Sequence, residues 1–160
     1  PTATLRTKQW PEERFSRLID HIRKKSDLAV VLSIGPGEEN IARRVLRHQR
    51  EPIPVYQGTD LEEFKAILQH SHCFIGNDSG PMHLAAALRR PVLAIFSSSN
   101  YDAWHPWGTT FEAVRTDLSC SPCPGYRCYR YESPRCVEGI TEEQVWQTLQ
   151  RLLSRIERQN

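Results

Sequence analysis

The stretch FIGNDSGPMH, residues 74–83, is the most informative part of the sequence about the fold. It passes from a short apolar strand, through a polar turn, into a helix that begins at about Pro81. The helix stays apolar and alanine-rich up to residue 88, and a second apolar run, PVLAIF, occupies residues 91–96. A strand, a helix and a second strand at this spacing predict a βαβ unit with parallel strands and a right-handed crossover.

The same alternation continues on both sides of this unit. The nearly unbroken apolar run LAVVLSI at residues 28–34 is typical of a buried parallel strand. Apolar residues at helical spacing indicate helices in the intervening segments. We expect further strands at 53–56 and 111–115, helices after Pro11 and at 38–50, 61–70 and 141–157, and loops at 97–110 and 118–137. The chain is therefore predicted to be an α/β protein with a parallel sheet and helices on both of its faces.

Length and composition exclude several classes of protein. With 160 residues and 39% apolar residues, the chain has the size and composition of one globular domain. Its apolar runs are far shorter than a membrane-spanning helix, and a net charge of +2 is too small to indicate nucleic-acid binding. The only methionine is Met82 and residue 1 is a proline, so we expect the chain to be part of a longer protein.

Residues 78–83 form the strongest candidate site. Ligands of open α/β sheets bind beyond the carboxyl ends of the strands, where this turn lies. Ser79 is a predicted helix N-cap, and the free N–H groups there suit a phosphate. Gly80 lets a ligand approach the backbone closely. Asp78 is placed to accept hydrogen bonds from ribose hydroxyls. His83 is placed to donate a hydrogen bond to a phosphate. A capped core helix without a ligand is the alternative, but it does not explain His83.

A second glycine-containing turn follows the first strand. Gly35-Pro36-Gly37 resembles the start of a dinucleotide-binding fingerprint, but Asn40 stands where the third glycine would be. The sequence therefore does not support the pyrophosphate-binding geometry of that fingerprint. Glu38, at a helix N-terminus, is placed to accept hydrogen bonds from a base or sugar, and the alternative is a glutamate that only complements the helix dipole.

Four cysteines near the C-terminus allow another function. Cys120, Cys123, Cys128 and Cys136 contain one CxxC pair with irregularly spaced partners, which is weaker than two such pairs. The alternative function is a metal- or redox-bearing interaction module built on this loop, and reduced thiols without a ligand are equally compatible with the spacing.

Tyrosines and arginines alternate over residues 126–135. Aromatic rings and cations interleaved in this way can stack bases, as in single-strand nucleic-acid binders. They can equally hold an anionic sugar or a phospholipid surface. Neither this patch nor the cysteines account for the motif at residues 78–83, so we expect no nucleic-acid partner.

Read in order, four stretches resemble the bacterial heptosyltransferases of glycosyltransferase family 9. They are KQWP at residues 8–11, GPGE at 35–38, NDSGPMHLAAA at 77–87 and PVLAIF at 91–96. The D-S-G-x-x-H-L-x-A-A segment is the most specific of them. The chain departs from the usual family pattern at Ser97-Ser98-Ser99-Asn100 and in the loop that contains Trp104 and Trp107.

The resemblance implies a GT-B fold, in which two Rossmann-like halves face a cleft. Residues 1–160 would be the C-terminal, donor-binding domain, with the N-terminal half absent. The reaction implied is inverting transfer of a sugar, without a metal or another cofactor. The family's catalytic base is an aspartate of the N-terminal half, so the resemblance implies no catalytic residue in this chain and no turnover by it alone.

The resemblance also implies partners and residue roles. The donor would be a nucleotide-diphosphate sugar, typically ADP-heptose, and the acceptor a lipopolysaccharide core or lipid A bound through the other half. The location implied is cytoplasmic and peripheral to the inner membrane, and the basic, arginine-rich composition is compatible with contact to anionic lipid.

By the same resemblance, Lys8 would neutralise the diphosphate and Glu38 would contact the nucleoside. The sugar-diphosphate would be held by Asp78, Ser79, Gly80 and His83.

Overall fold

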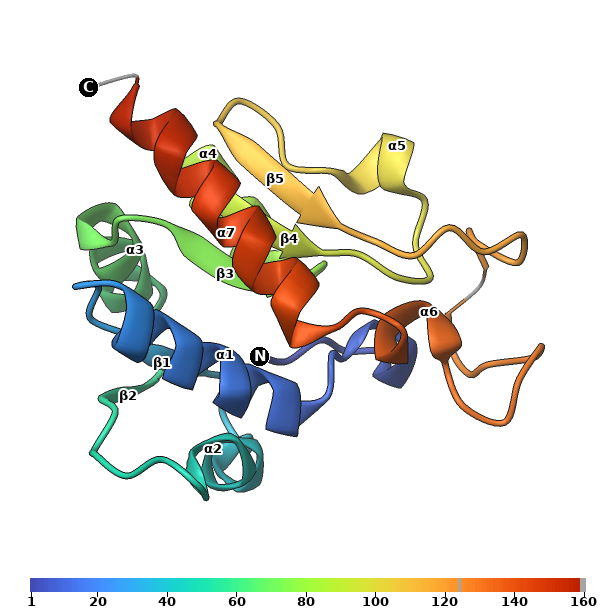
Figure 1. The fold of residues 1–160 in the computed structure, drawn as a ribbon, viewed down its shortest axis with the longest axis horizontal. Helices are drawn as coiled ribbons and strands as arrows, with labels where there is room; N and C mark the ends of the chain where they lie inside the picture. Colours follow the sequence, from blue (N-terminus) through green and yellow to red (C-terminus); the bar gives the residue numbers. More distant parts are fainter. Residues whose placement is uncertain (124, 159–160) are drawn as a thin grey trace.

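The computed structural model describes residues 1–123 and 125–158 (Figure 1). Residue 124, within the predicted cysteine loop, lies outside them. The strands are β1 (Leu32–Ile34), β2 (Val55–Gln57), β3 (Phe74–Asn77), β4 (Val92–Ile95) and β5 (Phe111–Val114). The helices are η1 (Arg6–Lys8), α1 (Glu12–Lys25), α2 (Glu39–Leu46), α3 (Leu61–His70), α4 (Gly80–Ala87), α5 (Tyr101–Trp104), α6 (Arg135–Glu138) and α7 (Glu142–Glu157).

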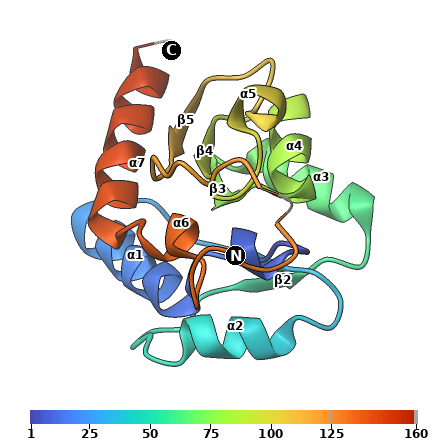
Figure 2. The ribbon, with the colours of Figure 1, turned by 90° about the vertical axis from the view of Figure 1, so that its right-hand side faces the viewer.

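The βαβ unit predicted from residues 74–96 is present. Strands β3, β4 and β5 form a parallel sheet in that order, with Phe74 opposite Val92 and Val92 opposite Phe111. Helix α4 covers one face of this sheet and α7 the other (Figure 2). The predicted arrangement of parallel strands with helices on both faces is therefore confirmed.

Strand β4 is the centre of the packing. Its four residues are completely buried, and its side chains alternate between two apolar clusters within the described residues. Leu93 and Ile95 join the cluster with α1 and α7, whereas Val92 and Ala94 join Met82 of α4 in the other. Burial on both faces explains why the sequence of β4 is continuously apolar instead of alternating.

Strands β1 and β2 form a separate parallel pair, with Leu32 opposite Val55, so the described strands make two sheets instead of the one that we predicted. The apolar run at residues 28–34 is a strand only from Leu32. Leu28 and Val30 still pack against the main cluster, while Val31 is 51% exposed. The apolar character of residues 28–34 therefore reflects side-chain burial over more residues than those that pair with β2.

Two predicted loops contain short helices. Helix α5 lies within 97–110 because the Asn100 side chain accepts from the amides of Asp102 and Ala103. Helix α6 lies at the end of the cysteine loop, after Pro134. Helix α2 ends at Leu46, four residues before the predicted end.

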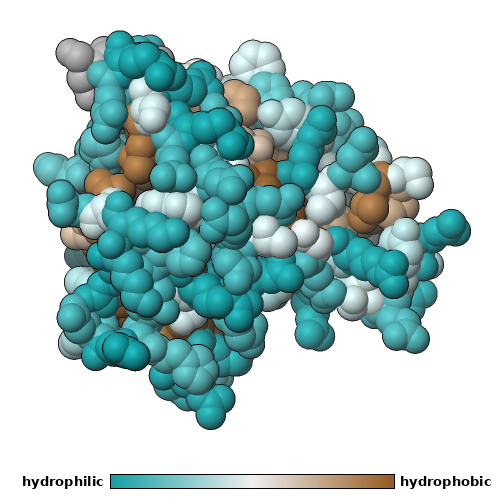
Figure 3. All heavy atoms as spheres, viewed as in Figure 1, coloured by the Kyte–Doolittle hydropathy of each residue, from teal (hydrophilic) through white to brown (hydrophobic). Residues whose placement is uncertain are grey.

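The face formed by α1 and α7 is mainly hydrophilic (Figure 3). Among the described residues, no helix is both long and apolar enough to cross a bilayer. The carboxyl ends of β3 and β4 instead meet the N-terminal segment of the chain, close to η1 (Figure 1). The candidate site lies at this junction.

Candidate functional site

The N-terminus of α4 has no side-chain cap. Ser79 occupies the N-cap position, but its hydroxyl makes no capping hydrogen bond and donates instead to the Asn77 carbonyl at 3.1 Å. A Cβ added at Gly80 would meet open space. The first N–H groups of a helix need partners, and here they face an accessible surface without a capping side chain. The structure thus does not contain the capped helix that was the alternative to a ligand site.

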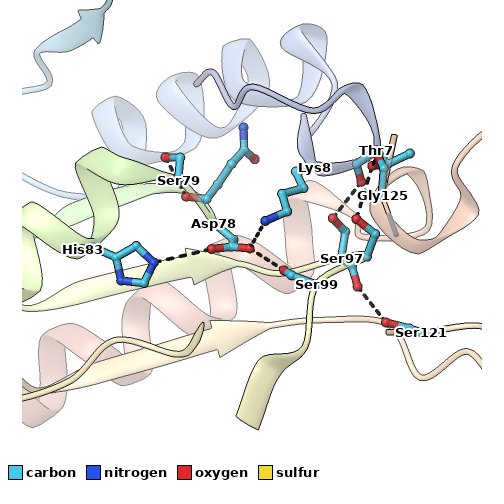
Figure 4. Close-up of polar contacts among 11 residues, drawn as sticks. Thr7, Lys8, Asp78, Ser79, His83, Ser97, Ser99, Ser121 and Gly125 are labelled. Carbon is cyan, nitrogen blue, oxygen red and sulfur yellow. Dashed lines mark hydrogen bonds and ion pairs between the residues drawn. The ribbon is translucent and has the colours of Figure 1, made fainter. Parts of the chain in front are cut away.

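Asp78 is the buried charge of the site. Its side chain is only 4% exposed, and its Oδ2 accepts from the Lys8 ammonium at 2.7 Å and from the Ser99 hydroxyl (Figure 4). The His83 Nε2 lies 3.8 Å from Oδ1, with the imidazole 40% exposed. A buried carboxylate is costly unless it is paired and hydrogen-bonded. Lys8 and Ser99 provide those partners.

Backbone contacts hold Asp78 in place. Its N–H donates to the Ile95 carbonyl at 3.1 Å, which continues the β3–β4 pairing by one residue. The neighbouring Asn77 is 1% exposed, and its side-chain oxygen accepts from the Trp10 N–H at 3.2 Å. The Trp10 indole in turn donates to the Ile140 carbonyl. The KQWP stretch is therefore joined to the NDSG stretch by hydrogen bonds.

The serines that follow β4 form hydrogen bonds to the N-terminal segment. Ser97 donates to the Thr7 carbonyl at 2.8 Å, and Ser98 donates to the Thr7 hydroxyl at 3.2 Å (Figure 4). The Thr7 hydroxyl also donates to the Gly125 carbonyl of the cysteine loop. These contacts place Lys8, at the end of η1, above Asp78.

A hollow of about 280 Å³, the β2–β3 hollow, opens at the carboxyl ends of β1, β2 and β3. The Tyr56 and Phe64 rings in its wall are stacked, with centroids 5.9 Å apart. Desolvation, aided by nearby carboxylates, raises the pKa of Tyr56. The lining residues are Pro1, Thr2, Ser33, Ile34, Gly35, Tyr56, Gly58, Thr59, Asp60, Leu61, Phe64, Phe74, Gly76, Asn77, Ser79 and Pro81.

A second hollow, the α5 hollow, lies on the other side of Asp78 and has a volume of about 370 Å³. Its wall is more polar than that of the β2–β3 hollow. It is lined by Leu5, Lys8, Ser98, Ser99, Asn100, Trp104, Pro122, Cys123 and Gly125. Asn77 and Ser79 thus face one hollow, whereas Lys8 and Ser99, the partners of Asp78, face the other.

Glu38 has a local structural contact. Its carboxylate accepts from the Gly35 N–H at 2.7 Å and so closes the turn between β1 and α2. Gly35 itself lines the β2–β3 hollow. Glu38 therefore lies beside this hollow with one carboxylate oxygen engaged in the turn.

Comparison with known proteins identifies the family. The model of glycosyltransferase family 9 (heptosyltransferase) matches residues 1–132, more than half of the chain. The chain belongs to glycosyltransferase family 9. It is 35% identical over 111 residues to lipopolysaccharide heptosyltransferase 3 of Escherichia coli K12, covering 67% of this chain and 32% of that protein. It is 26% identical over 151 residues to lipooligosaccharide heptosyltransferase 2 of Campylobacter jejuni, covering 91% of this chain and 47% of that protein.

Solved structures agree with the family-9 fold. The E. coli ADP-heptose lps heptosyltransferase II matches with a TM-score of 0.81 at 22% identity, over 98% of this chain and 46% of that one. The E. coli heptosyltransferase WaaC with ADP-2-deoxy-2-fluoro heptose matches with a TM-score of 0.72 at 23% identity, over 94% and 41%. The predicted fold class, one half of a GT-B fold, is confirmed. The family-9 chain spans between 32% and 47% of the length of these proteins.

The cysteines of this family-9 chain are free thiols. Cys120, Cys123, Cys128 and Cys136 line a small cavity of about 60 Å³. Burial, together with the nearby thiols of Cys123 and Cys128, raises the pKa of Cys136. Across residues 1–123 and 125–158, no three His, Cys, Asp or Glu side chains are grouped so that they could hold a metal ion.

The tyrosine–arginine segment is partly paired within itself. The Arg127 guanidinium lies 5.0 Å from the centre of the Tyr129 ring, and that of Arg135 lies 4.6 Å from Tyr131. Tyr126 and Tyr129 are exposed. These cation–π pairs give Arg127, Tyr129, Tyr131 and Arg135 contacts within the segment itself.

The structure brings most of the predicted residues together. Lys8, Asp78 and His83 form one cluster, with Ser79 and Gly80 at the adjoining helix end, while Glu38 lies apart in its own turn. Sequence reasoning missed Ser99, which had only been noted as a departure from the family pattern. It also missed the aromatic wall of the β2–β3 hollow, because Tyr56, Phe64 and Phe74 come from three separate elements.

Proposed function

We propose that this family-9 chain is the donor-binding, C-terminal half of an inverting glycosyltransferase. Its donor is a nucleotide-diphosphate sugar of the ADP-heptose type, and its acceptor is a lipopolysaccharide core or lipid A. The family match supports the reaction class. The solved E. coli structure with ADP-2-deoxy-2-fluoro heptose supports the donor.

One observation carries the proposal: the N-terminus of α4 has no side-chain cap and lies next to a lysine. The Ser79 hydroxyl points to Asn77, Gly80 leaves open space, and the Lys8 ammonium lies within 2.7 Å of Asp78. An ammonium has three donors, so its bond to Asp78 leaves two for another anion. A helix N-terminus and a cation together form a diphosphate site.

The β2–β3 hollow suits the nucleoside end of the donor. It is lined by apolar and aromatic side chains with a few polar groups, which is the usual character of a small-molecule pocket. Thr59 and Asp60 supply polar atoms at its rim. A base in this hollow would leave the diphosphate beside Gly80 and Lys8, with Asp78, Ser79 and His83 around it.

The catalytic base and most of the acceptor surface belong, in this proposal, to an N-terminal half. The chain covers less than half of each relative, which supports that division. We place the enzyme in the cytoplasm, with peripheral contact to the anionic inner membrane, because its acceptor is a lipid-linked glycan and its composition is basic.

Isothermal titration of the full-length protein with ADP tests the proposal. We expect saturable binding of one ADP per chain, and weakening by about tenfold or more in Lys8→Gln, since a charge-assisted hydrogen bond contributes about 1.5–3 kcal/mol. Lys65→Gln is the matched control, because Lys65 pairs with Glu62 on the surface of α3.

The thermal unfolding of Lys8→Gln must be measured in parallel, since the substitution leaves Asp78 with one fewer partner. A folded Lys8→Gln variant that binds ADP as tightly as the parent would refute the diphosphate role of Lys8. Failure of the parent protein to bind ADP or ADP-heptose would refute the donor site itself.

A further inference from the structure

The α5 hollow has the composition of a carbohydrate site. Its lining contains Ser98, Ser99, Asn100 and Lys8, whose side chains carry hydroxyl, amide and ammonium groups, together with Trp104. Sugar rings present hydroxyls at their edge and C–H groups on their faces. Hydrogen-bonding side chains suit the hydroxyls at the edge of such a ring, and an aromatic side chain suits the C–H groups on its face.

Trp104 is held in an exposed position. Helix α5 is fixed on its inner side, where the Tyr101 ring packs edge-on against Phe96 with centroids 5.2 Å apart. Asn100 caps the helix, and the Trp104 N–H donates to the Asn100 carbonyl at 3.1 Å. The Trp104 side chain nevertheless remains 56% exposed. An aromatic ring on a fixed element at the edge of a hollow offers a ligand a flat apolar surface.

The α5 hollow adjoins the diphosphate site. Lys8 and Ser99, which both bind Asp78, form part of its wall. The Trp104 indole also lies 6.0 Å from the His83 imidazole, between ring centres, in an edge-on arrangement. A nucleotide sugar with its base in the β2–β3 hollow and its diphosphate at Lys8 would extend its sugar toward Trp104.

We propose that Trp104 is a specificity-determining residue that stacks on the sugar ring of the bound nucleotide sugar, with Ser99 and Asn100 at the ring's hydroxyls. This inference rests on the proposed function, because it needs the diphosphate at Lys8. The β2–β3 hollow, with its three aromatic side chains, is the better site for a flat base. The hydroxyl-lined α5 hollow is the better site for a sugar.

Titration of the full-length protein with ADP and with ADP-heptose separates the two ends of the ligand. In Trp104→Ala, we expect the Kd for ADP-heptose to rise about tenfold while the Kd for ADP stays the same. Trp104→Phe keeps an aromatic plate and should restore most of the affinity. Trp107→Ala is the matched control: Trp107 is 70% exposed in the same loop, stacks on His105 and lies outside the α5 hollow.

Unchanged ADP-heptose affinity in Trp104→Ala would overturn the inference. Equal weakening of ADP and ADP-heptose would also overturn it, since it would place the nucleoside, not the sugar, on the indole. Failure of the parent protein to bind either ligand would instead overturn the proposed function and the inference with it. The titrations of the parent protein therefore distinguish the two failures.

Discussion

Asp78 links the packing of the fold to the proposed binding site. Its carboxylate is buried and would destabilise the fold if it were unpaired. Its partners come from η1 and from the segment after β4, so the charge ties together three parts of the chain. The same pairing positions the Lys8 ammonium beside the uncapped end of α4. A buried residue that joins three segments thus also holds the cation of the proposed diphosphate site.

Gly80 offers a test of binding that spares the fold. A methyl group at this position meets no protein atom, and alanine is at least as good a helix former as glycine. We expect Gly80→Ala to keep the stability of the parent or gain up to about 1 kcal/mol. The methyl group would occupy the space of a phosphate, so ADP affinity should fall about tenfold or more in calorimetry.

Gly108→Ala is the matched control for Gly80→Ala. Gly108 also has open space around it, but its φ is +73°, where a side chain strains the backbone. We expect a loss of about 1 kcal/mol of stability and unchanged ADP affinity. ADP binding by Gly80→Ala at the affinity of the parent would show that no phosphate lies against this residue.

Cys73 gives the protein a defined dependence on alkaline pH. Burial raises the pKa of its thiol from about 9 to about 11. Between these values the unfolded chain loses the proton while the folded chain keeps it. The free energy of unfolding therefore falls as pH rises from 9 to 11, by up to about 1 kcal/mol per pH unit.

Urea unfolding at pH 8 and pH 10 measures this effect. The parent should lose more stability between the two pH values than Cys73→Ala, which lacks the thiol. The difference isolates Cys73 from the lysines and tyrosines that titrate in the same range. Parallel losses in the two proteins would show that the Cys73 thiol ionises equally well in both states.

At the scale of elements, helices with strong local signals were predicted closely. Helix α3 has the predicted bounds, and α7 begins within one residue of the predicted start, where Thr141 and Gln144 form a capping box. Strand β1 was predicted too long because apolar residues signal burial, whereas a strand also needs a partner for its backbone. Helix α5 was missed because one turn held by an Asn100 cap has no periodicity to detect.

The capping box of α7 predicts a measurable loss of stability. The Thr141 hydroxyl accepts from the Gln144 N–H at 3.2 Å, and α7 packs on both α1 and the central sheet. We expect Thr141→Ala to lower the free energy of unfolding by about 1 kcal/mol in urea titration. Ser154→Ala, at an exposed position inside the same helix, should cause little change. Equal stability of both variants would mean that α7 does not depend on its cap.

At the scale of the whole molecule, the site could be predicted only in part. The stretches around Lys8 and Asp78 are 70 residues apart, and only the family resemblance placed them together; their ion pair confirms that they meet. Ser99 and Trp104 could not be assigned in advance, because their roles depend on how the segment after β4 packs on η1. The two hollows are likewise properties of the assembled fold, since no single element forms either of them.

In the proposed complex, one nucleotide binds across Asp78, from the β2–β3 hollow to Lys8. Amide chemical-shift mapping of the isotopically labelled full-length protein during an ADP titration tests it most directly. We expect saturable shifts at residues 77–83, at Lys8 and at Gly58, with little change in the Tyr126–Arg135 segment. Shifts confined to that segment or to the cysteines, or no shifts at all, would contradict it.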